Sequence, residues 1–303
     1  MTSATATRRS DLEHRAESAS ARLPGLLVAA RHIAATVALG SHGRRRPGMG
    51  ESFWQFRPYS SDDAPHAIDW RQSAKSDSVF VREREWISAQ TVTLWCVLSA
   101  SMHFRSHKDW PLKAERTATL SLALAILLIE GGEKIIRLGA DGSPVHGASA
   151  GRLALTHMAE RLAIDLAHPG IGGQPSFSSA MVRHGTTILM SDFLLPIAVI
   201  AQMLTSFAQR SQTLHLVQIL DPAEETLPYA GRVRFEGLED DGEFVIDRVE
   251  EARTAYIEKL TTHREALRAL CVAHGWSFAV HRTDMPPHLT LVALHRAIGE
   301  RDR

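Results

Sequence analysis

Residues Thr91–Met102 have the sequence TVTLWCVLSASM. An apolar run that ends at Leu98 is followed at once by Ser99-Ala100-Ser101, so two hydroxyl groups stand two residues apart. A short apolar run bounded by a polar turn is typical of a buried central strand in a parallel sheet. In an open α/β sheet, ligands and metal ions bind outside the carboxyl ends of the strands. The stretch therefore predicts a central strand with a functional edge after Leu98.

Strand and helix patterns alternate along the chain after this stretch. Further strands are expected at Lys134–Ala140, Thr186–Met190, Thr213–Leu220 and Trp276–His281. Helices are expected at Lys113–Glu130, Gly151–Ala167, Pro196–Arg210 and Asp247–Gly275, and a long loop from Asp221 to Glu243. Because such alternation is typical of parallel strand pairs, the sequence predicts an α/β fold with a doubly wound, mostly parallel sheet.

The chain divides into four regions. Residues 1–40 are expected to form a tail and a helix, with the helix over Leu23–Leu39, where apolar residues recur at helical spacing before Gly40. Residues 41–88 are expected to form a small β-rich subdomain, because Gly and Pro separate short runs of aromatic and polar residues. The α/β domain is assigned to residues 89–295, and a C-terminal tail to residues 296–303.

Composition and charge exclude several classes of partner. The 303 residues are 44% hydrophobic and 22% charged, as expected of a globular protein. There are 34 basic and 34 acidic residues, so the net charge does not indicate a nucleic acid or an anionic membrane as a partner. The N-terminus is polar, unlike a secretory signal, and neither apolar stretch, Ala118–Ile129 nor Phe193–Ala208, is expected to span a bilayer. We therefore expect a cytoplasmic protein.

Several separate segments resemble one bacterial family, known as domain of unknown function 58, whose members carry a von Willebrand factor A-like domain. There are four matching segments. The first combines Gly50–Phe53, Arg57–Tyr59, Asp62-Asp63 and Ile68–Arg71, and the others are Ser99–Met102, Leu189–Leu194, and Leu220–Glu225 continuing to Phe235. Their order and spacing are similar to the family over residues 40–295. The resemblance implies a von Willebrand A-like sheet, preceded here by the N-terminal helix and the β-rich appendage.

The resemblance also implies a metal site, which this sequence matches only in part. The metal-ion-dependent adhesion site of the von Willebrand A fold opens with Asp-x-Ser-x-Ser, and Val97 stands here in place of the aspartate before Ser99 and Ser101. Valine supplies no oxygen, whereas a hard divalent cation needs oxygen ligands. We therefore expect a degenerate site, in which the serine hydroxyls satisfy local backbone donors. Asp192 either holds a magnesium ion beside both serines or caps the helix expected at Pro196.

A second group of candidate residues lies in the β-rich region. Arg57 and Tyr59 belong to one matching segment, and Asp69-Trp70-Arg71 place a charge pair on either side of a large aromatic ring. Residues of this kind serve as anchors in protein interfaces. The alternative is a structural role, in which Asp69 satisfies buried donors and Trp70 covers the sheet.

The sequence predicts no enzyme. A GxSxG elbow, a Walker A sequence and a GxGxxG loop are all absent, and Ser101 with His103 is the nearest approach to a hydrolase pair. The resemblance implies an accessory protein of MoxR-type AAA+ ATPases, which often accompany family members, and a client protein as a second partner. We therefore expect a non-enzymatic interaction protein without a cofactor. The alternative hypothesis is a magnesium-dependent binding module that uses Ser99, Ser101 and Asp192. A third hypothesis is a hydrolase.

Overall fold

The computed structural model of the chain consists of two compact units. It describes residues 20–38, 53–60, 68–75, 78–84, 90–145, 147–169, 185–210, 212–238 and 242–300. The larger unit combines Met1–Ser41 with Thr91–Arg303, and the smaller unit is His42–Gln90. The smaller unit is thus an insertion between two segments that fold together.

A five-stranded sheet forms the centre of the larger unit. Its spatial order is β4-β3-β5-β6-β9, and every neighbouring pair is parallel. The strands are β3 (Thr91–Cys96), β4 (Lys134–Leu138), β5 (Thr186–Ser191), β6 (Thr213–Leu220) and β9 (Ser277–Arg282). Because the first of these strands lies inside the sheet and later strands extend it in both directions, the predicted doubly wound α/β sheet is confirmed.

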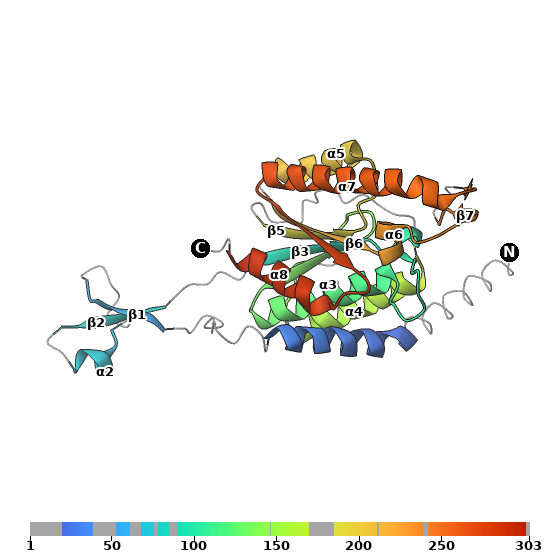
Figure 1. The fold of residues 1–303 in the computed structure, drawn as a ribbon. Helices are drawn as coiled ribbons and strands as arrows, with labels where there is room; N and C mark the ends of the chain where they lie inside the picture. Colours follow the sequence, from blue (N-terminus) through green and yellow to red (C-terminus); the bar gives the residue numbers. More distant parts are fainter. Residues whose placement is uncertain are drawn as a thin grey trace, which may run out of the picture. The chain divides into compact units, whose positions relative to one another are not determined.

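Helices cover both faces of the sheet (Figure 1). On one face, α5 (Ile197–Ala208) and α7 (Val249–Ala273) pack against the strands through one hydrophobic cluster. On the other face, a second cluster joins the strands to helix 20–38, α3 (Lys113–Glu130), α4 (Gly151–Ala167) and α8 (Pro287–Glu300). Among the described residues, no helix has both the length and the apolar character needed to cross a membrane.

The central helix α3 is buried along most of its length. Its bounds, Lys113–Glu130, are those predicted, and apolar side chains such as Leu120, Leu124 and Leu128 are almost fully buried. A helix that is apolar nearly all round belongs between other layers, and α3 indeed shares one hydrophobic cluster with the sheet, α4 and helix 20–38. The burial of α3 extends to its first residue, Lys113, which brings a charged group into the core.

Two predictions about the second half of the chain are wrong. The long loop expected from Asp221 to Glu243 contains the short helix α6 (Pro222–Thr226) and a hairpin of β7 (Val233–Glu236) and β8 (Glu243–Ile246). The start signal of α6 is Pro222 at the first helical position, directly after the Asp221 cap. The tail expected from residue 296 also begins later, since α8 runs to Glu300.

The smaller unit is built around one antiparallel pair. Strands β1 (Phe53–Pro58) and β2 (Phe80–Arg84) are paired, and the rings of Phe56 and Phe80 meet edge to face with centroids 6.4 Å apart. The short helix α2 (Trp70–Ser73) is tied to β2, because the Phe80 amide donates to the Ser73 hydroxyl at 2.9 Å.

Candidate functional site

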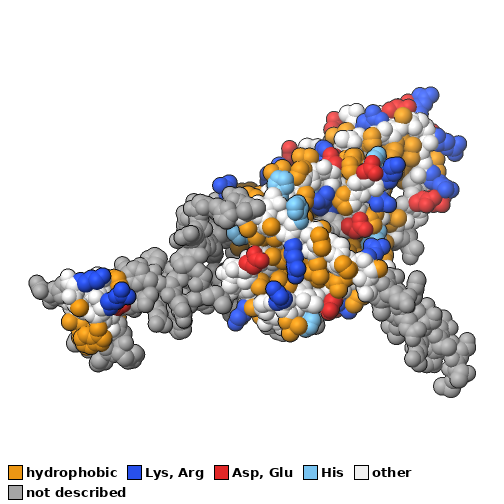
Figure 2. Space-filling model, turned by 90° about the horizontal axis from the view of Figure 1, so that it is seen from below, with side chains coloured by type: hydrophobic (Ala, Val, Ile, Leu, Met, Phe, Trp, Pro, Cys, Tyr) orange, Lys and Arg blue, Asp and Glu red, His pale blue; other side chains and the backbone are white. Residues whose placement is uncertain are grey.

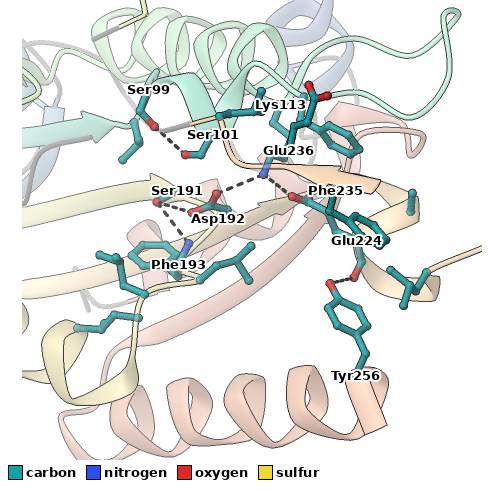
Figure 3. Close-up of a pocket in the computed structure, with 18 of the residues that line it drawn as sticks. Ser99, Ser101, Lys113, Ser191, Asp192, Phe193, Glu224, Phe235, Glu236 and Tyr256 are labelled. Carbon is teal, nitrogen blue, oxygen red and sulfur yellow. Dashed lines mark hydrogen bonds and ion pairs between the residues drawn. The ribbon is translucent and has the colours of Figure 1, made fainter. Parts of the chain in front are cut away.

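A cavity of about 740 Å³ opens at the carboxyl edge of the sheet (Figure 3). Residues from the ends of β3 and β5, the first turn of α3, α6, β7 and α7 line it. This is the edge at which Thr91–Met102 predicted a site, and Ser99, Ser101 and Asp192 all lie in its wall. We call this cavity the edge pocket.

The two serines of the edge pocket are hydrogen-bonded to one another. Their Oγ atoms lie 2.9 Å apart, and Ser99 is almost completely buried. Ala100–Met102 forms a tight helical turn, in which the Met102 amide donates to the Ser99 carbonyl at 3.0 Å. The strand-to-turn geometry expected after Leu98 is therefore present, and it directs both hydroxyls toward one point of the wall.

A buried lysine provides the cation of the edge pocket. Lys113 Nζ lies 2.6 Å from Glu224 Oε1 and 3.2 Å from Asp192 Oδ2, and only 1% of the lysine side chain is exposed. The three residues come from α3, α6 and the end of β5, so one ammonium group joins three elements (Figure 3). The macrodipole of α3 disfavours a positive charge in the first turn, and the two carboxylates offset this cost.

The pKa values of this group of residues follow from burial and charge. Burial lowers the pKa of Lys113, but the charges of Asp192 and Glu224 outweigh it, so the pKa lies above its ordinary value. Burial raises the pKa of Glu224, and the nearby ammonium only partly opposes this. Lys113 is therefore charged at neutral pH, and its charge is satisfied within the chain.

Asp192 does not cap α5, so the capping alternative is wrong. The N-cap of α5 is Pro196, which provides no side-chain hydrogen bond. Asp192 instead pairs with Lys113, and its Oδ1 atom lies 3.4 Å from the Ser191 hydroxyl. The next residue, Phe193, has a φ of 48°, a left-handed conformation that is uncommon for a bulky residue and marks a constrained turn.

The turn after Asp192 is held from two sides. Gln218 Nε2 donates to the Asp192 carbonyl at 2.8 Å, and His263 Nε2 lies 2.7 Å from the Phe193 carbonyl. Glu224 is held equally well, because its Oε2 atom accepts the Asp221 amide at 2.8 Å within the capping box of α6. Both carboxylates of the edge pocket are therefore in fixed positions.

The donor set of the edge pocket does not fit a magnesium ion. Val97 lines the pocket without contributing an oxygen, and the Lys113 ammonium is already paired with the carboxylate that a cation would need. Within the described part of the chain, no three His, Cys, Asp or Glu residues are grouped as metal ligands.

The contacts of His103 and Ser101 also argue against the hydrolase hypothesis. His103 Nδ1 lies 2.9 Å from the Ser99 carbonyl, and Nε2 lies 3.1 Å from the Leu166 carbonyl. Both ring nitrogens thus contact backbone oxygens, whereas a general base must reach the nucleophile's hydroxyl. Ser101 has its side-chain contact with Ser99 instead.

Apolar side chains lie at the mouth of the edge pocket, beside the ion pair of Arg234 and Glu236. Leu194, Leu195 and Leu238 line it and are 43–48% exposed. Phe235 of β7 contributes a ring that meets Tyr229 edge to face, with centroids 5.8 Å apart. The pocket therefore combines apolar side chains at its mouth with an ionic group in its wall.

Sequence reasoning missed Lys113 and Glu224. One available signal was the lysine in the first turn of an apolar helix. Such a helix is expected to be buried, and a buried lysine usually has a carboxylate partner. The sequence Asp221-Pro-Ala-Glu224 was another, since it is a capping box and predicts α6.

The candidate interaction residues of the β-rich region lie in the smaller unit. Asp69 caps α2 and accepts the Gln72 amide at 2.9 Å, whereas Trp70 is 68% exposed and does not cover the strands. Tyr59 is exposed, and Arg71 lies in the last turn of α2. Arg57 is in β1, and its side chain is outside the described residues.

Relatives of the chain include uncharacterized proteins of Mycobacterium tuberculosis and Mycobacterium bovis. Each is 26% identical over 218 residues, which cover 69% of this chain and 68% of the relative. Similar solved structures include the conserved hypothetical protein BatB from Bacteroides thetaiotaomicron, at 14% identity and a TM-score of 0.43, which covers 70% of this chain and 98% of BatB. Another is the VWA domain of SpRpn10, at 9% identity and a TM-score of 0.34, covering 68% of this chain and 95% of that domain.

The family model described as "Protein of unknown function DUF58" matches residues 55–266, which is more than half of the chain. This range includes three of the four sequence segments on which the resemblance was based, and most of the first. The resemblance is therefore confirmed, and the chain belongs to the DUF58 family.

Proposed function

We propose that this protein is a non-enzymatic interaction module of a MoxR-type AAA+ ATPase system. In this proposal the edge pocket is the docking site, and it binds the ATPase or a client protein without a metal ion. Family membership supports the ATPase as partner, since DUF58 members often accompany such ATPases. An ATPase partner requires ATP, so we propose that the protein works in the cytoplasm.

The observation that carries the proposal is the pairing of Lys113 with Asp192 and Glu224. In a metal-dependent site, the ion both neutralises carboxylates and shapes the binding surface. Here an ammonium group of the chain supplies the positive charge, at 2.6 Å from Glu224 and 3.2 Å from Asp192. This pairing supports binding at the edge without a metal ion.

The apolar side chains of the mouth support a protein as the ligand. Exposed apolar side chains grouped around a cavity are typical of interaction surfaces, because partner binding removes them from water. Leu194 and Leu195 follow Asp192 and Phe193 in the same turn, so the apolar side chains of the mouth and the ionic group belong to one structural feature.

Affinity capture tests this proposal. The tagged full-length protein is incubated with lysate of its own cells, with and without ATP, and captured proteins are identified by mass spectrometry. We expect nucleotide-dependent capture of a MoxR-type ATPase. The variant Leu195→Glu, which places a charge in the mouth of the edge pocket, should lose at least about ten-fold of the captured ATPase.

The matched control is Val272→Glu, because Val272 is 70% exposed on α7 and does not line the pocket. This variant should capture as much ATPase as the unmodified protein. Failure to capture any AAA+ ATPase under either condition would refute the proposed partner. Equal loss in both variants would refute the edge pocket as the docking site.

A further inference from the structure

We propose that the edge pocket binds a segment of the partner protein in which a lysine or arginine side chain is flanked by apolar residues. This inference rests on the proposed function of the same pocket and specifies the class of ligand. The inference has two grounds. One is the sign of the charges that a ligand can reach in the pocket, and the other is the apolar surface beside those charges.

The ionic group of Lys113, Asp192 and Glu224 presents its negative charges to the edge pocket. Lys113 is 1% exposed, whereas the side chains of Asp192 and Glu224 are 15% and 18% exposed. The ammonium thus lies behind the carboxylates, and two carboxylates face one ammonium. Arg234 also lines the pocket and is 60% exposed, but it pairs with Glu236 at 2.9 Å and lies 3.7 Å from Glu243, so these three residues add no net positive charge.

Asp192 has an oxygen available for a basic side chain. Its Oδ2 atom is paired with Lys113, while among the described residues its Oδ1 atom has only the long 3.4 Å contact with the Ser191 hydroxyl. A carboxylate oxygen accepts more than one hydrogen bond, and charge-assisted bonds to lysine or arginine are among the strongest. Figure 3 shows Asp192 between Ser191 and Lys113 at the wall of the pocket.

The tyrosines of the pocket report the same negative field. Burial is the main cause of the raised pKa of Tyr229 and Tyr256, but the negative charge of Glu224 adds to it at both residues. The same field favours a cation and opposes a carboxylate as the ligand. Aromatic rings beside the carboxylates, such as Tyr229 and Phe235, also suit a cation through their faces.

The surface around the cation site is apolar and extends beyond the cavity. Leu194, Leu195 and Leu238 are half-exposed at the mouth, and Phe193 and Met203 form a buried floor. A small cation would leave these leucines in water. A peptide whose basic residue has apolar neighbours covers them and gains the free energy of their burial.

The hairpin beside the pocket favours an extended chain as the ligand. All four residues of β7 (Val233–Glu236) line the pocket. In the part of the chain that the structure describes, β7 pairs with β8 alone, so its second edge has no strand partner. Such an edge accepts a peptide as an additional strand, which fixes the peptide's direction through backbone hydrogen bonds.

Selection from a peptide library tests the proposed ligand class. A phage-displayed library of random twelve-residue peptides is selected on the full-length protein, and the bound sequences are compared with the starting library. We expect enrichment of lysine or arginine next to leucine, isoleucine or phenylalanine. Enrichment of acidic peptides, or no enrichment at all, would overturn the inference.

The role of Asp192 is tested with a matched pair of peptides. The best selected peptide is synthesised with its basic residue and with norleucine in that position, and both are measured by fluorescence anisotropy. The unmodified protein should bind the basic peptide at least ten-fold more tightly, and Asp192→Asn should reduce this ratio to nearly one. An unchanged ratio would contradict the proposal, and the ratio does not depend on how much of the variant is folded.

Two further variants locate the peptide on the surface. Leu195→Ser should weaken binding of the basic peptide at least three-fold, while Val272→Ser on α7 should not change it. Equal binding to both variants would place the peptide elsewhere and overturn the inference. Adding the selected peptide to the affinity capture then separates the two proposals. If the peptide binds but does not displace the ATPase, the ligand class stands and the assignment of this pocket to the ATPase fails.

Discussion

At the scale of single residues, the most unusual group is the Lys113 ammonium. Burial of a charge is costly unless partners and hydrogen bonds offset the loss of hydration. Lys113 has Asp192 and Glu224 as partners, and each of these carboxylates is itself held by the backbone or by neighbouring side chains. The ion pair therefore links the first turn of α3 to the sheet edge and to α6.

Lys113→Met tests this link. The substitution keeps the length of the side chain but leaves Asp192 and Glu224 close together without a cation. We expect the free energy of unfolding to fall by about 3 kcal/mol, the lower end of the range for broken buried pairs, because both carboxylates are partly exposed. Urea unfolding measures the loss. The exposed Lys259→Met on α7 is the control, and a loss of similar size in both variants would contradict the role of Lys113.

Magnesium titration by calorimetry tests the degenerate metal site. We expect no saturable heat from the unmodified protein, and none from Val97→Asp alone, because the Lys113 ammonium still occupies Asp192. The double variant Val97→Asp with Lys113→Ser removes that competitor and adds a carboxylate, so it should gain saturable binding. Saturable binding by the unmodified protein would instead support the magnesium-dependent module.

At the scale of elements, the sequence predicted best where one pattern decides the structure. The bounds of α3, α4 and β6 agree with prediction, because an apolar period or a continuous apolar run defines each of them. The β7–β8 hairpin has no such pattern. Its strands are four residues each, and their stability comes from pairing with one another rather than from a buried face.

The candidate site was predicted only where its residues are close in sequence or belong to a known motif. Ser99, Ser101 and Asp192 follow strand ends, so the sequence places them at one edge. Lys113 lies 79 residues from Asp192 and 111 residues from Glu224, and no local pattern relates such distant positions. Their contact depends on the way α3 and α6 pack at the edge, which is a property of the folded chain.

The pairing of β9 with α8 makes stability depend on pH. His281 of β9 lies 2.8 Å from the Thr290 hydroxyl of α8 and is buried. Burial, together with the charge of Arg116, lowers the pKa of His281 from 6.5 to about 4, and Asp284 opposes this only in part. Between these values the unfolded chain binds more protons than the folded chain, so the free energy of unfolding falls as the pH decreases.

The expected loss between pH 6.5 and pH 4 is about 3 kcal/mol for His281 alone. Urea unfolding at several pH values measures it. In His281→Asn, which keeps a polar atom near Thr290, that part of the pH dependence should disappear. The exposed His157→Asn on α4 serves as the control, and an equal change of slope in both variants would show that His281 is not the group responsible.

At the scale of the whole molecule, charged and apolar side chains are mixed over one face of the described surface. Figure 2 views the face covered by helix 20–38 and α4, where basic, acidic and hydrophobic side chains are interspersed. This agrees with the balance of 34 basic and 34 acidic residues. A mixed surface suits a protein partner better than a nucleic acid, which agrees with the proposed docking site at the edge pocket.

The insertion of His42–Gln90 between helix 20–38 and β3 has a mechanical consequence. Closing a loop of this length costs about 3 kcal/mol of chain entropy. Burial of Leu26, Ile33 and Val37 stabilises the docked helix by about 1.5–3 kcal/mol for each side chain, which together exceeds that cost. A pull on the smaller unit is therefore borne by two anchors. One is the helix that packs on the core, and the other is β3, the strand that leads to Ser99. Tension applied to the insertion therefore acts directly on an interior strand of the sheet.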